Sequence, residues 1–379
     1  MPGQTKSGGL YIGLMSGTSM DGIDAALVRF GDHECDVLST FKYDYPDNLR
    51  DDLIAASRRP DECTVDLIGH LDHWTGECFR DAALGLIECS NFDTDSIVAI
   101  GSHGQTLRHQ PRAARPFTFQ IGDPNLIALG TGIRTVADFR RRDVADGGEG
   151  APLTPAFHHW LFSDPSKHRA VLNIGGIANV TILNSNSQNM IGFDTGPGNS
   201  LLDGWIRGHR EQAFDHDGEW ASEGFINENL LAHMLAEPYF DQPPPKSTGF
   251  EYFNGSWVRA RIASLGNEKV STVDVQATLA ELSARTITSS ILRFAPDIAE
   301  VLVCGGGVHN SNLLDRLRNS LPGVEMSSTE IYGVHPDWIE AVAFAWLAKR
   351  RLERKPANIP GVTGSAAAQV LGAIYPGCR

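Results

Sequence analysis

A polar loop at residues 16–22 separates two apolar stretches near the N-terminus. It reads Ser-Gly-Thr-Ser-Met-Asp-Gly, so two glycines permit a tight backbone path and three hydroxyl groups can donate hydrogen bonds. The loop is too long for a two-residue hairpin turn, and its composition suits a backbone cradle that binds an anion. An ordinary decorated hairpin is the alternative interpretation.

Polar residues also follow several predicted strands directly. Ser102 to Thr106 follow the apolar stretch 96–101, Asp194 follows Met190 to Phe193, and a Cys-Gly-Gly-Gly run follows Glu300 to Val303. Ligands of α/β proteins usually bind where strands end. Three consecutive glycines, Gly305 to Gly307, would let the backbone approach a flat group such as a nucleoside.

Asp194 stands between an apolar strand and a Gly-Pro-Gly turn. Aspartate is common in turns and at helix N-caps, which is one interpretation of this position. A general base or a magnesium partner is the other. Near the predicted strand 134–137, Arg140, Arg141 and Arg142 are consecutive, and this run fits either a solvated surface patch or an anion clamp.

Composition excludes several classes of function. The formal net charge is −14, which argues against nucleic acid or an anionic membrane surface as the main partner. The six cysteines form no Cys-x-x-Cys pair, which favours reduced thiols in a cytoplasmic protein. No secretory leader is expected, and the longest apolar run near the end, 341–348, is too short to span a membrane.

Two familiar nucleotide motifs are also absent. The segment 243–249 resembles part of a phosphate-binding P-loop, but Pro245 stands before Lys246 where that motif requires glycine. No Gly-x-Gly-x-x-Gly follows a predicted strand, so a Rossmann site is not supported.

The chain divides into two strand-rich halves, each of which opens with a hairpin around a glycine-containing turn. Strands are predicted at 10–15, 23–30, 35–45, 96–101, 117–121, 134–137, 171–174, 180–183, 190–193 and 300–303. Helices are predicted at 48–58, 66–89, 274–294 with Asp274 as its cap, 312–320 and 337–353. The glycine-rich stretch 147–150 predicts a hinge, with a domain boundary near residue 142.

Ten motifs in one order resemble the anhydro-N-acetylmuramic acid kinase family over nearly the whole chain. They are GLMSGTSMDGIDAAL, GSHGQT, FQIGDPN, VADFRRRDVA, GAPLTPAFH, LNIGGIANVT, GFDTGPGNSLLD, PPPKSTG, CGGGVHN and VLGAIYP. The family resembles the wider actin, sugar-kinase and heat-shock ATPase superfamily. One departure is Glu149 in DGGEGAP, where we expect glutamine, and it concerns the hinge or the substrate neighbourhood.

The resemblance implies a two-domain α/β fold of the actin-like ATPase (ribonuclease H-like) type, with ATP and sugar in the interdomain cleft. It implies an N-terminal domain at 1–142, a C-terminal domain at 143–359, and a segment of about 360–379 that packs back on the first domain. A cytoplasmic homodimer acting in cell-wall recycling is implied as well.

The implied reaction consumes ATP, water and 1,6-anhydro-N-acetylmuramic acid, and gives N-acetylmuramic acid 6-phosphate and ADP. A base must deprotonate a water aimed at the anomeric carbon, as in an inverting glycosidase. We expect Asp194 to be that base and Glu340 to share this work, while Mg²⁺ bridges the phosphate oxygens of ATP.

The resemblance also implies the binding residues. Thr106 and Arg140 are expected at the sugar, with Arg140 on its lactyl carboxylate, while His103 and Gln105 shape their loop. The residues expected to bind ATP are Gly17, Thr18, Ser19, Met20, Asp21, Gly22, Ile23, Asp24, Gly305, Gly306, Gly307 and Asn310.

Two other functions remain open at this point. The chain could phosphorylate a different 1,6-anhydro sugar such as levoglucosan, and an arginine dispensable for substrate affinity would favour that function. It could instead be a non-sugar, actin-like or chaperone-like ATPase, which long polymer-contact insertions or a separate peptide-binding domain would support. The sequence shows neither feature.

Overall fold

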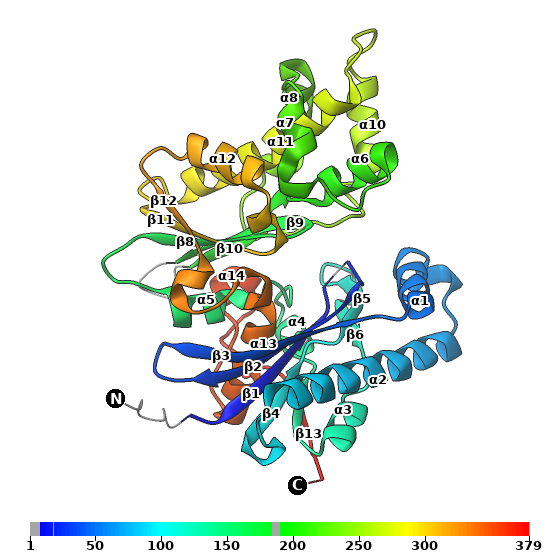
Figure 1. The fold of residues 1–379 in the computed structure, drawn as a ribbon, viewed down its shortest axis with the longest axis vertical. Coiled ribbons are helices and arrows are strands. Elements are labelled where there is room, and N and C mark those ends of the chain that lie inside the picture. The colour runs from blue at the N-terminus through cyan, green and yellow to red at the C-terminus, as the bar shows by residue number, and fades with distance from the viewer. Residues whose placement is uncertain (1–7, 18, 184–189, 379) are drawn as a thin grey trace. The chain divides into compact units, whose positions relative to one another are not determined.

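The structure is a computed structural model that describes residues 8–17, 19–183 and 190–378. The chain folds into two compact units (Figure 1). The first unit holds the residues up to Leu161 together with 332–334 and 338–379, and the second unit holds 162–331 and 335–337. No helix in the described ranges is both long enough and apolar enough to cross a lipid bilayer.

The first unit is built on a six-stranded sheet. Its order is β13 (Ala373–Tyr375), β7 (Thr135–Ala137), β4 (Ile97–Ser102), β1 (Leu10–Met15), β2 (Gly22–Phe30) and β3 (Cys35–Asp44). β1, β4 and β7 are parallel, whereas β2, β3 and β13 pair antiparallel with their neighbours. A separate antiparallel hairpin joins β5 (Gln105–Gln110) to β6 (Phe117–Ile121).

Helices cover both faces of this sheet. They are α1 (Asp47–Arg58), α2 (Val65–Ser90), α3 (Pro124–Thr131), α4 (Arg141–Ala145), α5 (Thr154–Phe162, which ends at the unit boundary), α13 (Ile339–Leu352) and α14 (Pro360–Thr363). Ile12 and Leu14 of β1 are fully buried in one core with Phe79 and Ala83 of α2. Because side chains alternate along a strand, Gly13 points to the opposite face, against α13.

A pair of glycines lets α13 approach the sheet closely. Gly13 of β1 is the direct partner of Gly101 in β4. A Cβ atom on Gly13 would lie 1.8 Å from the carbonyl oxygen of Ala341, and one on Gly101 would lie 2.1 Å from that of Phe344. Any larger residue at either position must therefore push the helix away.

The second unit repeats the strand order of the first. Its five-stranded sheet runs β10 (Ile191–Pro197), β9 (Ile177–Leu183), β8 (Arg169–Ile174), β11 (Glu300–Cys304) and β12 (Glu325–Ser328). β8, β11 and β12 are parallel, like β1, β4 and β7 in the first unit. β8, β9 and β10 are antiparallel, like β1, β2 and β3 in the first unit. This pair of related α/β units is the architecture of the actin-like ATPase fold.

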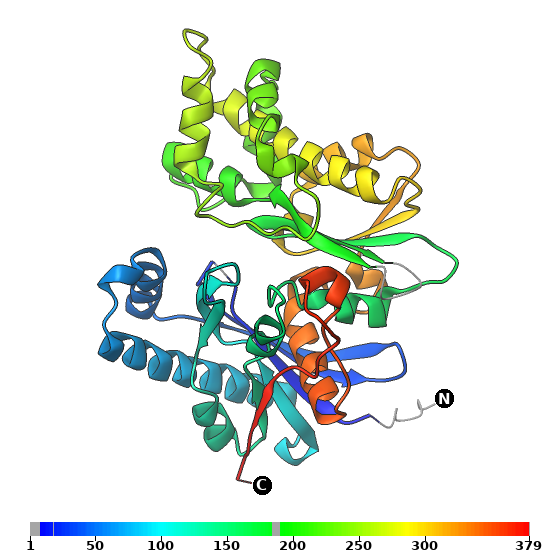
Figure 2. The ribbon, with the colours of Figure 1, turned by 180° about the vertical axis from the view of Figure 1, so that it is seen from behind.

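A helical cluster is built onto the second sheet (Figure 2). The helices are α6 (Ser200–Arg210), α7 (Glu219–Glu223), α8 (Glu228–Leu235), α9 (Pro238–Asp241), α10 (Gly255–Ala263), α11 (Thr272–Phe294) and α12 (Ser311–Ser320). Ile287 and Ile291 of α11 pack in the core of the sheet, whereas Val275 and Leu279 of its first half pack among α6, α8 and α10. Short 3₁₀ turns lie at 60–62, 94–96, 216–218, 306–309, 329–332 and 336–338.

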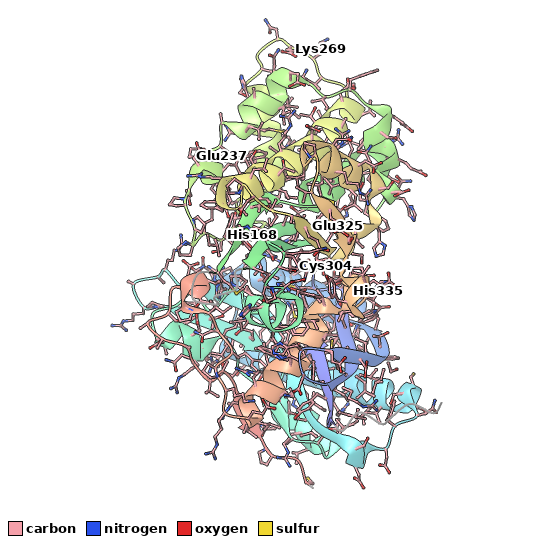
Figure 3. All side chains as sticks on the ribbon, turned by 90° about the vertical axis from the view of Figure 1, so that its left-hand side faces the viewer. His168, Glu237, Lys269, Cys304, Glu325 and His335 are labelled. Atoms are coloured by element: carbon pink, nitrogen blue, oxygen red, sulfur yellow. The ribbon has the colours of Figure 1, made fainter. Side chains whose placement is uncertain are left out.

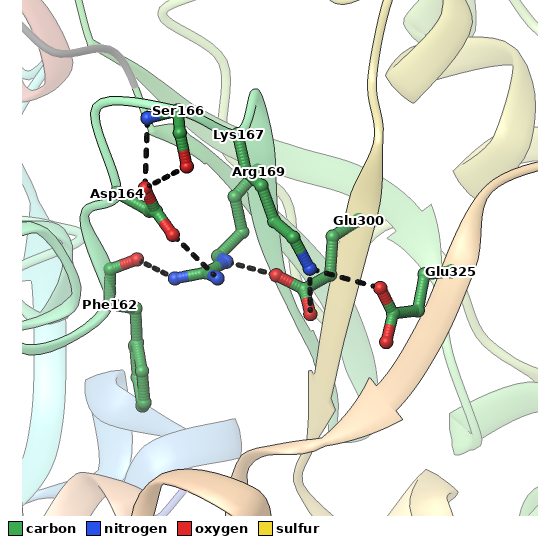
Figure 4. A network of polar contacts seen from close by, with 7 residues as sticks. All are labelled: Phe162, Asp164, Ser166, Lys167, Arg169, Glu300 and Glu325. Atoms are coloured by element: carbon green, nitrogen blue, oxygen red, sulfur yellow. Dashed lines mark hydrogen bonds and ion pairs between the residues drawn. The ribbon is translucent and has the colours of Figure 1, made fainter.

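A buried ion pair holds the start of the second unit (Figure 4). Arg169 at the beginning of β8 and Glu300 at the beginning of β11 are 2% and 1% exposed, and the guanidinium donates to the carboxylate and to the carbonyl oxygen of Phe162. Lys167 lies 3.1 Å from Glu325 and 3.7 Å from Glu300. Removing one partner of a buried ion pair would leave the other charge uncompensated, which is strongly destabilising. The network therefore holds the first residues of the second unit in place.

Most of the predicted elements are confirmed, with two local corrections. Ser271, not Asp274, is the N-cap of α11: its hydroxyl accepts from the backbone N–H of Asp274 and donates to the Asp274 carboxylate. The Asp274 carboxylate also accepts from the backbone N–H of Phe225 at 2.8 Å. Asp194 lies inside β10 and not after it, at a bulge before Gly196.

The compact units do not divide where the sequence predicts domain boundaries, near 142 and 359. The rings of Phe157 and Trp160 in α5 pack at a tilt against Trp346 of α13, with centroids 6.0 Å and 5.9 Å away, which keeps α5 in the first unit. The predicted hinge is also tied down, because Gly150 N–H donates to Asp143 and Glu149 N–H donates to the Thr363 carbonyl. Motion about residues 147–150 stays a prediction.

Replacing Gly13 by Ala is expected to lower the free energy of unfolding by about 1–3 kcal/mol, because the new methyl group overpacks the interface with α13. Urea denaturation followed by circular dichroism measures this change. Gly69→Ala is the matched control, since a Cβ at that helical position meets nothing within 4 Å. The control is expected to be neutral or slightly stabilising. Equal stability of the two variants would contradict the close-packing argument.

Candidate active site

The loop between β1 and β2 is held by the segment that follows β4. Ser16 Oγ lies 2.6 Å from the Gly22 carbonyl oxygen and 2.7 Å from Gln105 Oε1, and Gln105 Nε2 donates to the Gly17 carbonyl at 3.1 Å. Gln105 is fully buried. It therefore holds the 16–22 loop, whereas the sequence predicts only that Gln105 shapes its own loop.

Within the loop, Asp21 is the charged group. Its carboxylate accepts from Ser19 Oγ and lies 3.4 Å from Lys42 Nζ. Burial opposes ionisation, but the Ser19 hydrogen bond and the Lys42 charge outweigh it and lower the pKa of Asp21. Met20 takes a left-handed φ of 51° at the turn. Thr18, also predicted to bind ATP, lies outside the described residues.

The remaining loop residues belong to β2. Gly22 is buried between strands, where a Cβ would lie 2.4 Å from the Tyr43 carbonyl oxygen, and the side chain of Ile23 is fully buried. These two predicted ATP contacts could be made only by their backbones. Asp24 follows on the same strand and is half-buried.

Arg140 is oriented by two contacts at the N-terminus of α4. Its Nε donates to His103 Nε2 at 3.0 Å and its Nη1 donates to the Gly150 carbonyl at 2.7 Å. Because His103 Nε2 accepts this bond, its ring is neutral with the proton on Nδ1. Burial, and then the Arg140 charge, hold the pKa of His103 well below its ordinary value, consistent with that assignment.

Glu340, in the first turn of α13, interacts electrostatically with Arg140 and Asp24. Burial raises the pKa of Glu340, with the nearby Arg140 opposing this and Asp24 adding to it. Burial also lowers the pKa of Arg140 to about 10, which leaves the guanidinium charged at neutral pH. The first unit thus brings together an oriented cation and a carboxyl group that retains its proton more readily than usual.

Thr106 lies on the β5–β6 hairpin. Its hydroxyl accepts from Gln120 Nε2 at 3.1 Å, and the same amide donates to Thr118 at 2.8 Å. His109 Nδ1 lies 2.9 Å from the Thr118 hydroxyl. Burial, followed by the charge of Arg140, lowers the pKa of His109 to about 4.

In the second unit, Asp194 is held by the segment that follows α9. Thr248 N–H donates to its Oδ2 at 3.0 Å, its own N–H donates to the Lys246 carbonyl at 3.1 Å, and the Tyr239 hydroxyl donates to its carbonyl at 2.8 Å. The PPPKSTG segment is therefore not a phosphate loop. It positions Asp194, a role that sequence reasoning missed.

Lys246 completes this support. Its ammonium is buried, donates to the carbonyl oxygens of Tyr239 and Phe240, and lies 4.6 Å from the centre of the Tyr239 ring. Burial is the main cause that lowers the pKa of Lys246 to about 8. Its charge interacts with that of Asp194.

The glycine run after β11 packs against the end of β8. A Cβ on Gly305, whose φ is +78°, would lie 2.2 Å from Asn173 Oδ1, and one on Gly307 would lie 2.3 Å from Ile174 Cγ2, whereas Gly306 faces open space. Asn310 caps α12, because its Oδ1 accepts from Leu313 N–H at 2.9 Å. This capping bond leaves the amide nitrogen of Asn310 as the part that could bind a ligand.

Two further groups border the glycine run and were missed from the sequence. Gly305 N–H donates to the Pro336 carbonyl, and His309 Nε2 lies 3.0 Å from both carboxylate oxygens of Asp337 (Figure 3 labels Cys304 and His335 nearby). The turn between β8 and β9 is bonded to the turn that follows β10. The carbonyl oxygens of Gly176 and Gly175 accept hydrogen bonds from the N–H groups of Gly198 and Asn199, respectively.

The candidate residues thus form one set in each unit. The described members in the first unit are Gly17, Ser19, Met20, Asp21, Gly22, Ile23, Asp24, Thr106, Arg140 and Glu340, and those in the second are Asp194, Gly305, Gly306, Gly307 and Asn310. No group of three or more His, Cys, Asp or Glu side chains among the described residues is arranged to hold a metal ion.

Comparison with known proteins gives one consistent family. The family model described as anhydro-N-acetylmuramic acid kinase matches residues 9–377. Relatives named anhydro-N-acetylmuramic acid kinase include one from Coxiella burnetii (strain Dugway 5J108-111), 50% identical over 96% of this chain and 97% of its own. Another, from Shewanella amazonensis, is 47% identical over 97% of this chain and 98% of its own.

Among solved structures, a ROK family glucokinase from Streptomyces griseus in complex with glucose and AMPPNP aligns with a TM-score of 0.40. It is 15% identical and covers 90% of this chain and 100% of its own. The family model spans nearly all of the sequence, and the relatives match over nearly their full length. The chain belongs to the anhydro-N-acetylmuramic acid kinase family.

Proposed function

We propose that this protein uses ATP and water to convert 1,6-anhydro-N-acetylmuramic acid into N-acetylmuramic acid 6-phosphate and ADP. The observation that carries the proposal is the family match over residues 9–377, together with relatives of that name at about half identity. The reaction opens the anhydro bridge with water at C1 and transfers the γ-phosphoryl group to the oxygen released at C6. Both units contribute candidate residues.

Asp194 is the proposed base for the attacking water. Its carboxylate is oriented by a backbone N–H at Oδ2, and its main chain is fixed on both sides by Lys246 and Tyr239. A base must be held within hydrogen-bond reach of the water that it deprotonates, so this rigidity favours the role. Glu340 is proposed to share the work on the water from the first unit.

Arg140 is proposed to bind the lactyl carboxylate. Two of its nitrogens are occupied by His103 and Gly150, and its Nη2 makes no hydrogen bond within the part of the chain that the structure describes. A fixed guanidinium that keeps a donor available suits a substrate carboxylate. The Thr106 hydroxyl, on a hairpin in the field of Arg140, is proposed to bind the same sugar.

ATP is proposed to use backbone donors of the 16–22 loop for its phosphates and the open surface at Gly306 for its nucleoside. Mg²⁺ would neutralise phosphate charge in the transfer step. The ionised Asp21 and the half-buried Asp24 repel phosphate but suit the ion or its waters, so these oxygen donors fit Mg²⁺.

A cytoplasmic location and a homodimer are part of the proposal. The six cysteines are all free thiols in the structure, as expected in a reducing compartment. The homodimer is supported by the family resemblance. Gel filtration with light scattering measures the oligomeric state directly.

Mass spectrometry of the product tests the reaction itself. The product is expected to exceed the anhydro sugar by one phosphate and one water, whereas a plain kinase would add phosphate alone. In ¹⁸O-labelled water the label is expected at the anomeric hydroxyl, because water attacks C1. Label in the phosphate ester, or ADP formed without any sugar phosphate, would refute the proposal.

Asp194→Asn is expected to reduce turnover by at least about 10³-fold, because the amide cannot accept the proton of the water. Binding of ATP and sugar, measured by calorimetry, should change little. Asp241→Asn is the matched control, since Asp241 is another carboxylate that interacts electrostatically with Lys246. Turnover within a few-fold of the unmodified chain in Asp194→Asn would remove Asp194 from the mechanism.

Arg140→Gln is expected to raise the KM for 1,6-anhydro-N-acetylmuramic acid by about 30-fold or more, which corresponds to a lost charged contact of about 2 kcal/mol or more. The KM for 1,6-anhydro-N-acetylglucosamine, which lacks the lactyl group, should change much less. Arg134→Gln is the exposed control. Equal effects of Arg140→Gln on both sugars would favour a kinase for another anhydro sugar.

A further inference from the structure

A second cationic site lies in the first unit, in a cavity of about 440 Å³. We call it the arginine pocket. Its walls come from the end of β7, from α4, from the end of α13 and from the segment that leads into β13. The lining residues are Asp138, Arg141, Arg142, Arg351, Val370, Gly372 and Ala373.

The arginine pocket carries an excess of positive charge. Arg141 lies 3.5 Å from Asp138, and no carboxylate among the described residues forms an ion pair with Arg142 or Arg351. Three guanidinium groups and one carboxylate therefore leave about two uncompensated charges. This local excess of positive charge contrasts with the formal net charge of −14 of the whole chain. Like charges around one cavity repel each other unless an anion lies between them.

Neutral groups contact all three arginines, and Arg141 pairs with the Asp138 carboxylate as well. Arg142 Nε donates to Gln369 Oε1 at 3.1 Å and Arg351 Nε donates to the Gly372 carbonyl at 2.8 Å. The Arg141 guanidinium lies 5.9 Å from the centre of the Phe119 ring. These contacts restrain the three guanidinium groups but use only a few of their N–H donors. The other donors are therefore available to a ligand.

Asp138 sets the geometry at the edge of the arginine pocket. It has a left-handed φ of 59°, a conformation that aspartate and asparagine tolerate better than most residues. Its carboxylate pairs with Arg141, which reduces the positive charge that this arginine presents to the cavity. Removing the Asp138 charge without changing its shape should therefore strengthen anion binding.

The arginine pocket is separate from the proposed sugar contact at Arg140. Arg140 is directed at His103 and Gly150, and neither of these residues lines the pocket. The run of three arginines thus divides between two purposes, because Arg140 precedes α4 while Arg141 and Arg142 form its first turn.

We propose that the arginine pocket binds a small phosphorylated anion, a phosphate monoester or pyrophosphate, at a site distinct from the substrate site. A phosphate monoester carries about two negative charges at neutral pH, which matches the uncompensated charge. The cavity is of the size that holds a small ligand. The anion has two candidate sources: a free metabolite such as pyrophosphate, or a sugar 6-phosphate of the kind that the proposed reaction releases.

The test titrates pyrophosphate, inorganic phosphate and N-acetylmuramic acid 6-phosphate separately into the full chain, with the nucleotide site saturated by a non-hydrolysable ATP analogue. Calorimetry is expected to show binding of at least one probe that weakens as salt increases. Arg142→Gln and Arg351→Gln are each expected to weaken that binding at least 10-fold. Arg318→Gln, a half-exposed arginine of the second unit, is the control and should have no effect.

Asp138→Asn distinguishes lost anion recognition from a folding defect. This variant is expected to bind the anion about three-fold more tightly or better, which a misfolded protein would not do. Turnover without added anion should match the unmodified chain in all pocket variants. Tight binding of the sugar phosphate alone would identify the product as the source, and pyrophosphate binding would identify a free metabolite. Binding of no probe at millimolar concentration, or equal binding in all variants, would overturn the proposal.

Discussion

The close approach of α13 to β1 and β4 is the constraint on which the first unit depends. Two facing glycines, Gly13 and Gly101, remove the side chains that would keep the helix at its normal distance. The helix is almost wholly apolar where it crosses the sheet, and its first turn carries Glu340. A packing requirement in the sheet therefore decides where a candidate catalytic carboxyl group lies, and the burial that results raises its pKa.

The polar side chains of the candidate site are fixed by other groups in their own unit. Hydrogen bonds to His103 and Gly150 restrain the Arg140 side chain. Hydrogen bonds with Thr248, Lys246 and Tyr239 restrain Asp194 in the same way. Such support costs stability, because buried charges such as Lys246 must be desolvated. In return, polar groups that are already held in place need little reorganisation when a ligand binds, which is the usual source of electrostatic stabilisation.

The sequence was sufficient to predict the features that depend on local pattern. Apolar periodicity located nearly every long helix and strand, and the glycine motifs located the loops that now border the candidate sites. The contacts between distant segments could not be predicted. Nothing local in PPPKSTG indicates that its backbone holds Asp194. The cap of α11 is different, because Ser271 lies three residues before Asp274 and this Ser-x-x-Asp spacing is itself a local signal for a helix start. The arginine run was ambiguous for the same reason, because residues distant in the sequence, His103 for Arg140 and Gln369 for Arg142, decide which way these guanidinium groups point.

The shared strand order of the two sheets has a consequence for how such a protein diversifies. An ancestral duplication would supply the common frame, and new parts could then be added in the connections without disturbing either core. The β5–β6 hairpin with Thr106 occupies one such connection in the first half, between β4 and β7, and helices α6 to α11 fill another in the second, between β10 and β11. Substrate preference would then evolve in these additions, while the ancestral frame stays nearly constant.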